Sequence, residues 1–332
     1  MIGLITVPSE NNSTREKRDD IGNASRSDVQ FKLGSDPAKA DPLAIFLSDP
    51  ESHLSDILYL YFRIYKKKLL WAFARTAFAK LELDKSQTLW ITDVGASMGF
   101  DILYLLRRLT RDFRDPLPYQ RVFVSLVEGD EKLINEAKRT LKHVLAASEV
   151  DFQYYRYPLV EGLPLRDETQ HLAICSEVVE HLQEPAELLQ EVLRVLKPGG
   201  FLILTTDNSP SLLQRIKRIP VYLSGKYENN YARPSPNSEV VTTLRWKGRE
   251  YPIFGHINLN PTRYWEKLSE DIGFEIASFG TYESIRRGGG SKSPVALAGY
   301  FALGALVYHL MPRKLGRFFG DTTALLLRKP ER

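Results

Sequence analysis

One stretch, residues 89–106, limits the folds open to this chain more than any other. Its sequence, LWITDVGASMGFDILYLL, predicts a buried strand (90–94), a tight turn from Gly95 to Gly99 and a helix that begins near Phe100. Glycine has no Cβ and tolerates positive φ, so such a turn lets backbone N–H groups at a helix N-terminus approach a ligand closely. The stretch therefore predicts an α/β fold that binds a nucleotide-like ligand.

Strand and helix patterns alternate after this stretch. Further strands are predicted at residues 121–128, 152–157, 172–176, 201–205, 274–282 and 323–328. Helices are predicted at residues 131–144, 185–196 and 261–272, the second of them ending at Lys197-Pro198-Gly199-Gly200. Strands separated by helices imply parallel order, so the predicted fold class is α/β with a doubly wound sheet.

The remaining segments suggest how the chain is organised. Residues 1–40 are polar without sustained periodicity, which predicts a disordered or loosely attached tail. Residues 41–84 are expected to form a helical cap, because apolar residues recur at helical spacing within them. Residues 85–332 then form the main domain. Within it, residues 207–260 break the strand and helix rhythm and are rich in aromatic residues, so we expect a substrate lid there.

A second insertion, residues 284–320, contains an uncharged run at 294–311 with basic flanks. The run leaves little polar face, which is typical of a buried helix or a lid. Basic flanks beside an apolar helix also favour contact with an anionic membrane surface, and both interpretations stay open. A full membrane span is not expected, because the strand at 323–328 must return to the sheet.

Composition limits the compartment and the partners. The single cysteine, Cys175, excludes an intramolecular disulfide and favours a reducing compartment, so we expect a cytoplasmic protein, with peripheral contact at the inner membrane face as the variant. No secretory signal is expected at the N-terminus. The net charge of +4 is too small to indicate a nucleic-acid partner. Cys175 itself is predicted to be a buried strand residue, not a nucleophile.

The acid that ends the second predicted strand narrows the ligand. Glu128 lies 29 positions after Gly99, and an acid at that place can accept hydrogen bonds from both ribose hydroxyls of a nucleoside. Ser97 stands where dinucleotide-binding turns carry their central glycine, which counts against NAD. A mononucleoside cofactor is therefore favoured.

These residues resemble the class I S-adenosylmethionine-dependent methyltransferases. The resemblance rests on five motifs in the family's order: DVGASMG (93–99), LVEGDEKLINEAK (126–138), LPL (163–165), CSEVVEHL (175–182) and LRVLKPGGFLILTTDN (193–208). It implies an enzyme with a Rossmann-like, seven-stranded mixed sheet and S-adenosylmethionine as cofactor. The cofactor-binding residues that it implies are Asp93, Gly95, Ala96, Ser97, Gly99, Glu128, Gly129, Leu159 and Ser176.

Two positions depart from the family's pattern. The loop Tyr157-Pro158-Leu159 lacks the aspartate that often binds the adenine amino group, so it offers only backbone there. The usual Phe-Asp before the fourth strand is Gln170-His171. Both departures concern contacts rather than the fold.

The segment 177–181, EVVEH, carries the candidate chemistry. If a helical turn begins here, Glu177, Glu180 and His181 share one face. His181 could take the proton from a substrate hydroxyl, with Glu177 as the second catalytic candidate. Alternatively Glu177, Glu180 and His181 could bind a divalent metal, with His256 as a fourth ligand. That set resembles the Glu-x-x-Glu-His run of the ubiquinone-biosynthesis O-methyltransferases and the small-RNA 3′-terminal 2′-O-methyltransferases. A third interpretation is that the segment only caps a helix and shapes the pocket.

The predicted function is O-methylation of a hydroxyl on a sugar, a glycan or a lipid-linked small molecule. The aromatic-rich insertion and the basic, apolar C-terminal segment favour such an acceptor over a nucleic acid. Two alternatives stay open: a metal-dependent RNA 2′-O-methyltransferase, and a non-catalytic methyltransferase-like binding module.

Overall fold

The computed structural model describes residues 54–81, 86–112, 121–145, 150–208, 240–282, 320 and 322–331. Three predictions lie outside the described residues: the polar tail at 1–40, the first part of the predicted lid, and the apolar run at 294–311.

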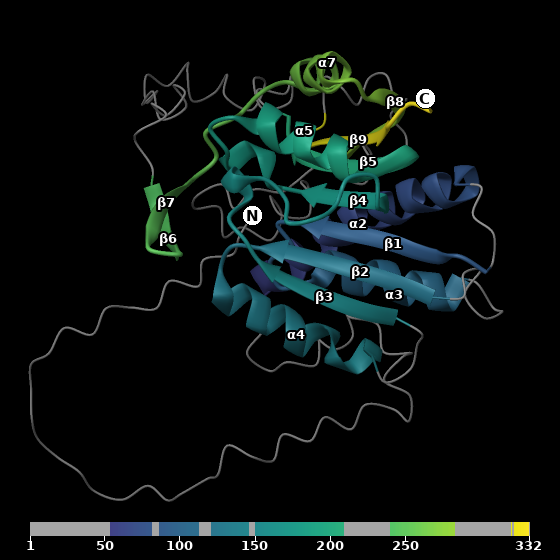
Figure 1. The fold of residues 1–332 in the computed structure, drawn as a ribbon, viewed down its shortest axis with the longest axis horizontal. Helices are drawn as coiled ribbons and strands as arrows, with labels where there is room; N and C mark the ends of the chain where they lie inside the picture. Colours follow the sequence, from purple (N-terminus) through teal and green to yellow (C-terminus); the bar gives the residue numbers. More distant parts are fainter. Residues whose placement is uncertain are drawn as a thin grey trace, which may run out of the picture.

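The strands form the predicted doubly wound sheet (Figure 1). Seven strands lie in the order β3-β2-β1-β4-β5-β9-β8. Their bounds are β1 Thr88–Val94, β2 Arg121–Glu128, β3 Val150–Arg156, β4 Gln170–Ser176, β5 Leu196–Asp207, β8 Glu275–Tyr282 and β9 Thr322–Arg328. The first five run parallel, and β9 pairs antiparallel with both β5 and β8. The prediction of a mixed seven-stranded sheet is confirmed.

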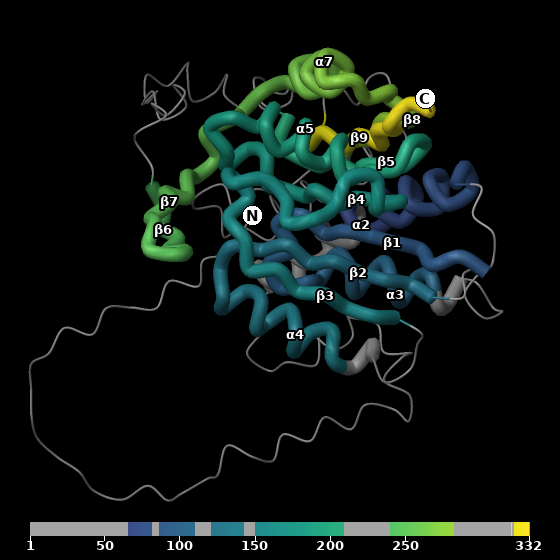
Figure 2. The backbone as a smooth tube through the Cα atoms, in the orientation of Figure 1, coloured from purple at the N-terminus to yellow at the C-terminus, as the bar shows by residue number. Residues whose placement is uncertain are grey.

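Helices cover both faces of this sheet. On one side lie α2 (Leu54–Lys80), α3 (Phe100–Asp112) and α4 (Glu131–Leu145), and on the other lie α5 (Pro185–Val195) and α7 (Thr262–Ile272), as Figure 2 shows. The central strands are buried on both faces, which explains their nearly continuous apolar sequences. Two apolar cores follow, one on each side of the sheet.

Two local features differ from the sequence predictions. The run at 197–200 does end α5, but it also starts β5, because the chain becomes extended directly at Leu196. The insertion contains regular structure that its sequence did not reveal: β6 (Val240–Trp246) and β7 (Arg249–Phe254) form a separate antiparallel pair. Their side chains are mostly exposed, so an alternating apolar pattern is missing.

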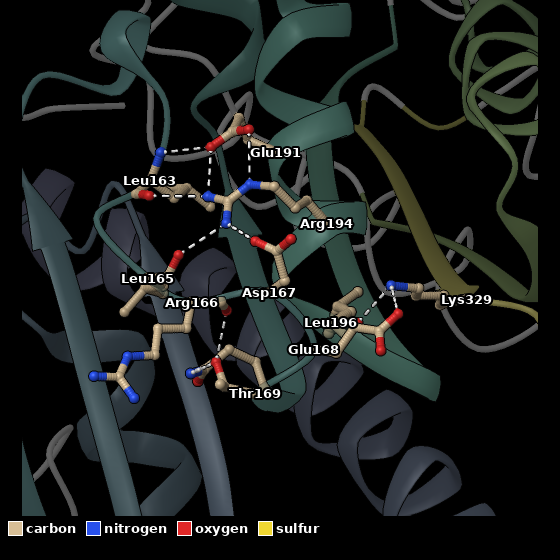
Figure 3. A network of polar contacts seen from close by, with 11 residues as sticks. Leu163, Leu165, Arg166, Asp167, Glu168, Thr169, Glu191, Arg194, Leu196 and Lys329 are labelled. Atoms are coloured by element: carbon tan, nitrogen blue, oxygen red, sulfur yellow. Dashed lines mark hydrogen bonds and ion pairs between the residues drawn. The ribbon is translucent and has the colours of Figure 1, made fainter.

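Arg194 of α5 fixes the segment that leads into β4. Its guanidinium donates to the carbonyl oxygens of Leu163 and Leu165, and it pairs with Glu191 and Asp167 (Figure 3). Charge-assisted bonds of this kind are stronger than neutral ones and favour one geometry. The Leu163 to Leu165 motif is therefore a structural junction.

None of the helices in the described ranges is both long enough and apolar enough to span a bilayer.

Candidate functional site

The turn after β1 lies at the carboxyl edge of the sheet, beside the end of β2. Gly95 N and Ala96 N donate to Val127 O at 2.9 and 3.2 Å, and Gly99 N donates to Ala96 O before α3 begins. Gly95 has φ +71°, and a Cβ there would lie only 2.4 Å from Val178 Cγ2. Glycine at this position is thus required by the backbone and by the packing of Val178.

Glu128 is bound to this turn by its carboxylate. Ser97 N donates to one oxygen at 2.9 Å, and Asp130 N donates to the other at 3.1 Å. Burial raises the pKa of Glu128, and the two backbone N–H groups oppose that rise. The structure therefore brings together the glycine turn and the acid that the sequence analysis assigned to one ligand.

Acidic side chains surround the same turn. Asp93 is 2% exposed, and its Oδ2 has no hydrogen-bond partner among the described residues. Burial raises the pKa of Asp93 well above its usual range, and neighbouring Asp101 adds to the rise. Lys66 reaches in from α2 and lies 3.3 Å from Asp101 Oδ2 and 3.5 Å from Glu177 Oε2. The turn is thus lined by acidic side chains, two of which pair with one buried ammonium group.

Glu177 does not share a helical face with Glu180 and His181, so that prediction is wrong. It precedes the short 3₁₀ helix Val179–His181 and has a left-handed φ of +57°. The left-handed residue turns the chain between β4 and the helix, and the Glu177 carboxylate pairs with Lys66 instead. A catalytic or metal-binding role of Glu177 stays a prediction.

Glu180, His181 and His256 do come together. One ligand atom from each of them lies within 4.8 Å of the others. His181 Nδ1 lies 3.0 Å from Phe254 O and 3.1 Å from Gly255 O, and His256 Nδ1 lies 2.5 Å from Asp207 Oδ2. The two imidazole rings pack edge to face with their centroids 4.7 Å apart.

The bonding fixes which ring nitrogen of His181 carries the proton. Carbonyl oxygens only accept, so Nδ1 is the N–H and Nε2 holds the lone pair. Nε2 is buried and has no partner among the described residues. Burial lowers the pKa of His181 to about 4, with His256 adding to the effect, so the ring is neutral near pH 7. This leaves a lone pair available for a proton or a metal ion.

Glu180 lies beneath the two histidines and is completely buried. Thr206 Oγ1 donates to its Oε2 at 3.0 Å, and Oε1 lacks a partner within the described part of the chain. Burial raises the pKa of Glu180 to about 7, and the charges of Asp207 and Glu177 contribute. Two backbone N–H groups, of Ile257 and Asn258, donate to the Glu180 carbonyl and tie this residue to the segment that carries His256.

The other predicted residues lie around this site. Ser176 Oγ is 2.8 Å from Thr205 Oγ1, and Leu159 begins a 3₁₀ helix that ends at Glu161. A Cβ on Gly129 would lie 2.6 Å from Leu244 Cδ2 of β6. Cys175 is buried and burial raises the pKa of its thiol, in line with the structural role predicted for it.

Sequence reasoning missed two residues. Asp207 was read only as the start of the insertion, although it ends a strand and so lies at the ligand-binding edge of a doubly wound sheet. Lys66 stands in a run of three lysines, a pattern typical of a solvated face, whereas it is 4% exposed. Its neighbours Lys67 and Lys68 made its burial impossible to predict, because a run of lysines usually faces solvent.

Fold and site together define a class: a doubly wound α/β protein with a glycine turn bound to an acid, and with a buried acid and two histidines clustered beyond the strand ends. Comparison with known proteins agrees. The family model described as "Methyltransferase domain" matches residues 118–204. A ubiquinone biosynthesis O-methyltransferase of Leptothrix cholodnii is 28% identical over 160 residues, covering 43% of this chain and 66% of that protein. A demethylmenaquinone methyltransferase of Chlamydia trachomatis is 31% identical over 158 residues, covering 44% and 64%.

The chain thus spans slightly less than two thirds of the length of these relatives. Among solved structures, the CurJ carbon methyltransferase has a TM-score of 0.48 at 15% identity, covering 89% of this chain and 62% of that one. The [4+2]-cyclase SpnF has a TM-score of 0.43 at 18% identity, covering 80% and 82%. Residues 118–204 of the chain are thus similar to methyltransferase domains, and its seven-stranded mixed sheet is the fold that the resemblance to the class I S-adenosylmethionine-dependent methyltransferases implies.

Proposed function

We propose that this chain transfers a methyl group from S-adenosylmethionine to a hydroxyl of a small molecule. The observation that carries the proposal is the buried Nε2 of His181, which keeps its lone pair while Nδ1 is anchored on backbone carbonyls. Such a group can receive the proton that a hydroxyl must lose when it becomes a methyl ether.

The residues beside the turn fit the cofactor. The Glu128 carboxylate suits ribose hydroxyls, and its two backbone donors hold it in place and favour its ionised form. The carboxylates of Asp101 and Glu177 beside the turn suit a sulfonium cation. When bound, the cofactor supplies an electrophilic methyl group on its sulfur.

The protein's own part is alignment and proton transfer. The carboxyl ends of β4 and β5 would hold the acceptor hydroxyl between the cofactor turn and His181 Nε2. The oxygen gains the methyl group and its proton moves to Nε2, while Nδ1–H stays on the carbonyls of Phe254 and Gly255. The charge that was on sulfur ends on the imidazole, so atoms and charges balance.

A second candidate is the metal-assisted form of the same reaction, and one observation favours it. Both histidines have Nδ1 anchored, His181 on carbonyls and His256 on Asp207, so both Nε2 atoms can face a common ion together with Glu180. Anchoring of the second ring nitrogen is typical of metal-ligating histidines. A divalent ion there would lower the pKa of the acceptor hydroxyl.

For the acceptor we propose a hydroxyl on a sugar, a glycan or a lipid-linked small molecule. The aromatic residues of the insertion, such as Trp246 and Tyr251, support rings or sugars as partners. The relatives named for ubiquinone and menaquinone biosynthesis support lipid-linked acceptors. A cytoplasmic location with contact at an anionic membrane surface remains part of this proposal; wild-type protein that stays in the supernatant with anionic liposomes would contradict the contact.

The decisive experiment combines binding and turnover. Calorimetry measures S-adenosylmethionine binding, and transfer of a labelled methyl group is then measured against hydroxylated sugars, glycolipids and prenylated phenols, with and without a chelator. Binding with transfer to one hydroxyl class supports the proposal. Absence of binding favours the non-catalytic alternative. Activity that a chelator abolishes and Mn²⁺ or Mg²⁺ restores supports the metal form, and chelator-insensitive turnover removes it.

A further inference from the structure

The segment from β6 to the start of α7 touches both halves of the site. We call residues 240–258 the arm: it consists of β6, β7 and the chain from Gly255 to Asn258 that follows them. Figure 1 shows β6 and β7 beyond the ends of the parallel strands, away from the helical layers. A two-stranded sheet of this kind is barely stable alone in water, so its contacts with the main domain decide its position.

The tip of the arm rests on the chain that follows β2. Leu244 lies so close to Gly129 that a Cβ on this glycine would be 2.6 Å from Leu244 Cδ2. Gly129 directly follows Glu128, the acid that faces the ribose in the proposed function. Leu244 thus packs on the residue that directly follows the proposed ribose-binding acid.

The tip also rests on the chain that follows β3. The Trp246 ring packs edge to face on Tyr157 with the centroids 5.0 Å apart, and Arg156 donates to Arg245 O at 2.9 Å. Two residues further on, Leu159 is the position that family resemblance sets against the adenine. The base of an adenosine held by Glu128 must therefore lie between two loops that the arm bridges.

A third contact fixes the return strand. Tyr251 donates its hydroxyl to Glu161 Oε1 at 2.6 Å, and Arg249 pairs with the same oxygen at 3.3 Å. Glu161 ends the short helix that Leu159 begins. Both strands of the arm are thus attached to the loops around the proposed adenine position.

The last residues of the arm, 254–258, contact the cluster of Glu180, His181 and His256. Phe254 O and Gly255 O accept from His181 Nδ1, and the next residue, His256, binds Asp207. The backbone N–H groups of Ile257 and Asn258 donate to Glu180 O. One continuous segment of 19 residues (240–258) therefore contacts the loops around the proposed adenine position and also sets the tautomer of His181.

We propose that the arm is a cofactor-binding element: Leu244 and Trp246 form the outer wall of the adenine subsite, and closure of the arm on the base positions His181 and His256. This inference rests on the proposed function. The loop Tyr157-Pro158-Leu159 offers no side-chain donor for adenine, and the arm supplies an aliphatic and an aromatic surface where that recognition is missing. Stacking of a base on an aromatic side chain contributes enough binding energy for a clear effect on affinity.

The test measures binding of S-adenosylhomocysteine and of 5′-methylthioadenosine, which lacks the amino-acid end, by calorimetry with full-length protein. The variant Leu244→Ala/Trp246→Ala is expected to raise both dissociation constants at least tenfold and by the same factor, because only the base contact is lost. Val241→Ala on the same strand is the matched control, since Val241 is 44% exposed, and should change either constant less than twofold. Equal affinities for wild type and the double variant would overturn the proposal.

Hydrogen exchange of the wild type provides a second measurement that needs no variant. Adding S-adenosylhomocysteine is expected to slow amide exchange in β6 and β7 and, as closure requires, at Ile257 and Asn258. Tight binding with unchanged amide exchange across 240–258 would overturn the proposed role of the arm and leave the proposed function intact. A wild type that binds neither nucleoside would overturn both.

Discussion

Each of the two edges of the parallel sheet carries a histidine with a lowered pKa, and the two rings are bonded in opposite ways. At the amino edge, His171 Nδ1 accepts from Trp90 N at 3.0 Å and Nε2 lies 2.9 Å from Lys197 Nζ. At the carboxyl edge, His181 is anchored through Nδ1 alone. Burial lowers the pKa of both rings to about 4. A depressed pKa therefore does not distinguish the two histidines, whereas the buried Nε2 of His181, which has no partner among the described residues, does.

The bonding at the amino edge is that of a structural junction. Trp90 N–H can only donate, so Nδ1 of His171 is the acceptor. Its Nε2 faces the Lys197 amine, whose charge lowers the pKa of the ring further. Every polar atom of this ring is satisfied by the fold, which leaves nothing for a ligand.

The largest expected effect is a loss of turnover when the His181 ring, with its Nε2 lone pair, is removed. His181→Ala should reduce kcat by ~10² or more, because the hydroxyl proton loses its acceptor. The affinity for S-adenosylmethionine should change less than threefold, since the ring is bonded to the carbonyls of Phe254 and Gly255 and not to Glu128. Steady-state kinetics and calorimetry check the two halves, and an unchanged kcat would discard the base. His171→Asp serves as the control for replacing a buried histidine.

At the amino edge the expected effect is on stability alone. His171→Ala should lower the free energy of unfolding by about 3 kcal/mol, because Trp90 N–H loses its acceptor and a cavity remains. His171→Asp should cost less than about 1 kcal/mol, since a carboxylate can accept from Trp90 and pair with Lys197. Urea unfolding measures both. If the two variants were equally unstable, the ring itself and not its hydrogen bonding would be what matters.

Lowering the pH should reduce the contribution of His171 to the free energy of unfolding. The pKa of His171 is about 4 in the folded chain and roughly 6.5 when unfolded, so the unfolded state binds more protons between these values. This contribution to stability is complete above pH 6.5 and is lost as the pH falls through 6.5 toward 4. Between pH 8 and pH 5 the wild type should lose about 2 kcal/mol more than His171→Asp. Equal losses in urea unfolding at the two pH values would contradict the role of His171.

The same contrast explains how far the sequence alone could lead. The sheet was predictable because β1, β2, β4 and β5 are nearly continuous apolar runs between amphipathic helices. Glu128 was predictable as well, because its place after a strand fixes its edge of the sheet. The role of His171 was not, since its partners, Trp90 N–H and Lys197, lie 81 and 26 positions away.

The cluster of Glu180, His181 and His256 was only partly predictable, for a related reason. The motif at 177–181 carried Glu180 and His181, but the pairing of His256 with Asp207 joins positions 49 apart across the insertion. Glu177 was placed wrongly because helical spacing was assumed where one left-handed residue redirects the chain. Long-range packing and single φ values leave no periodic signal in a sequence.

The smallest effect expected at the carboxyl edge comes from the backbone of the cofactor turn. Ser97 has φ +47°, a left-handed conformation that strains a residue with a Cβ, and its N–H still donates to Glu128. Ser97→Gly relieves that strain but makes the unfolded chain more flexible, so we expect a net gain of about 0.5 kcal/mol in the free energy of unfolding. Ser97→Ala keeps the Cβ and should leave stability unchanged, which makes it the matched control. Because the bond to Glu128 comes from the backbone, neither variant should alter cofactor affinity more than twofold. A large loss of affinity in both variants would instead assign the Ser97 hydroxyl to the cofactor, and the carboxyl edge would then use that side chain for binding as well as for the turn.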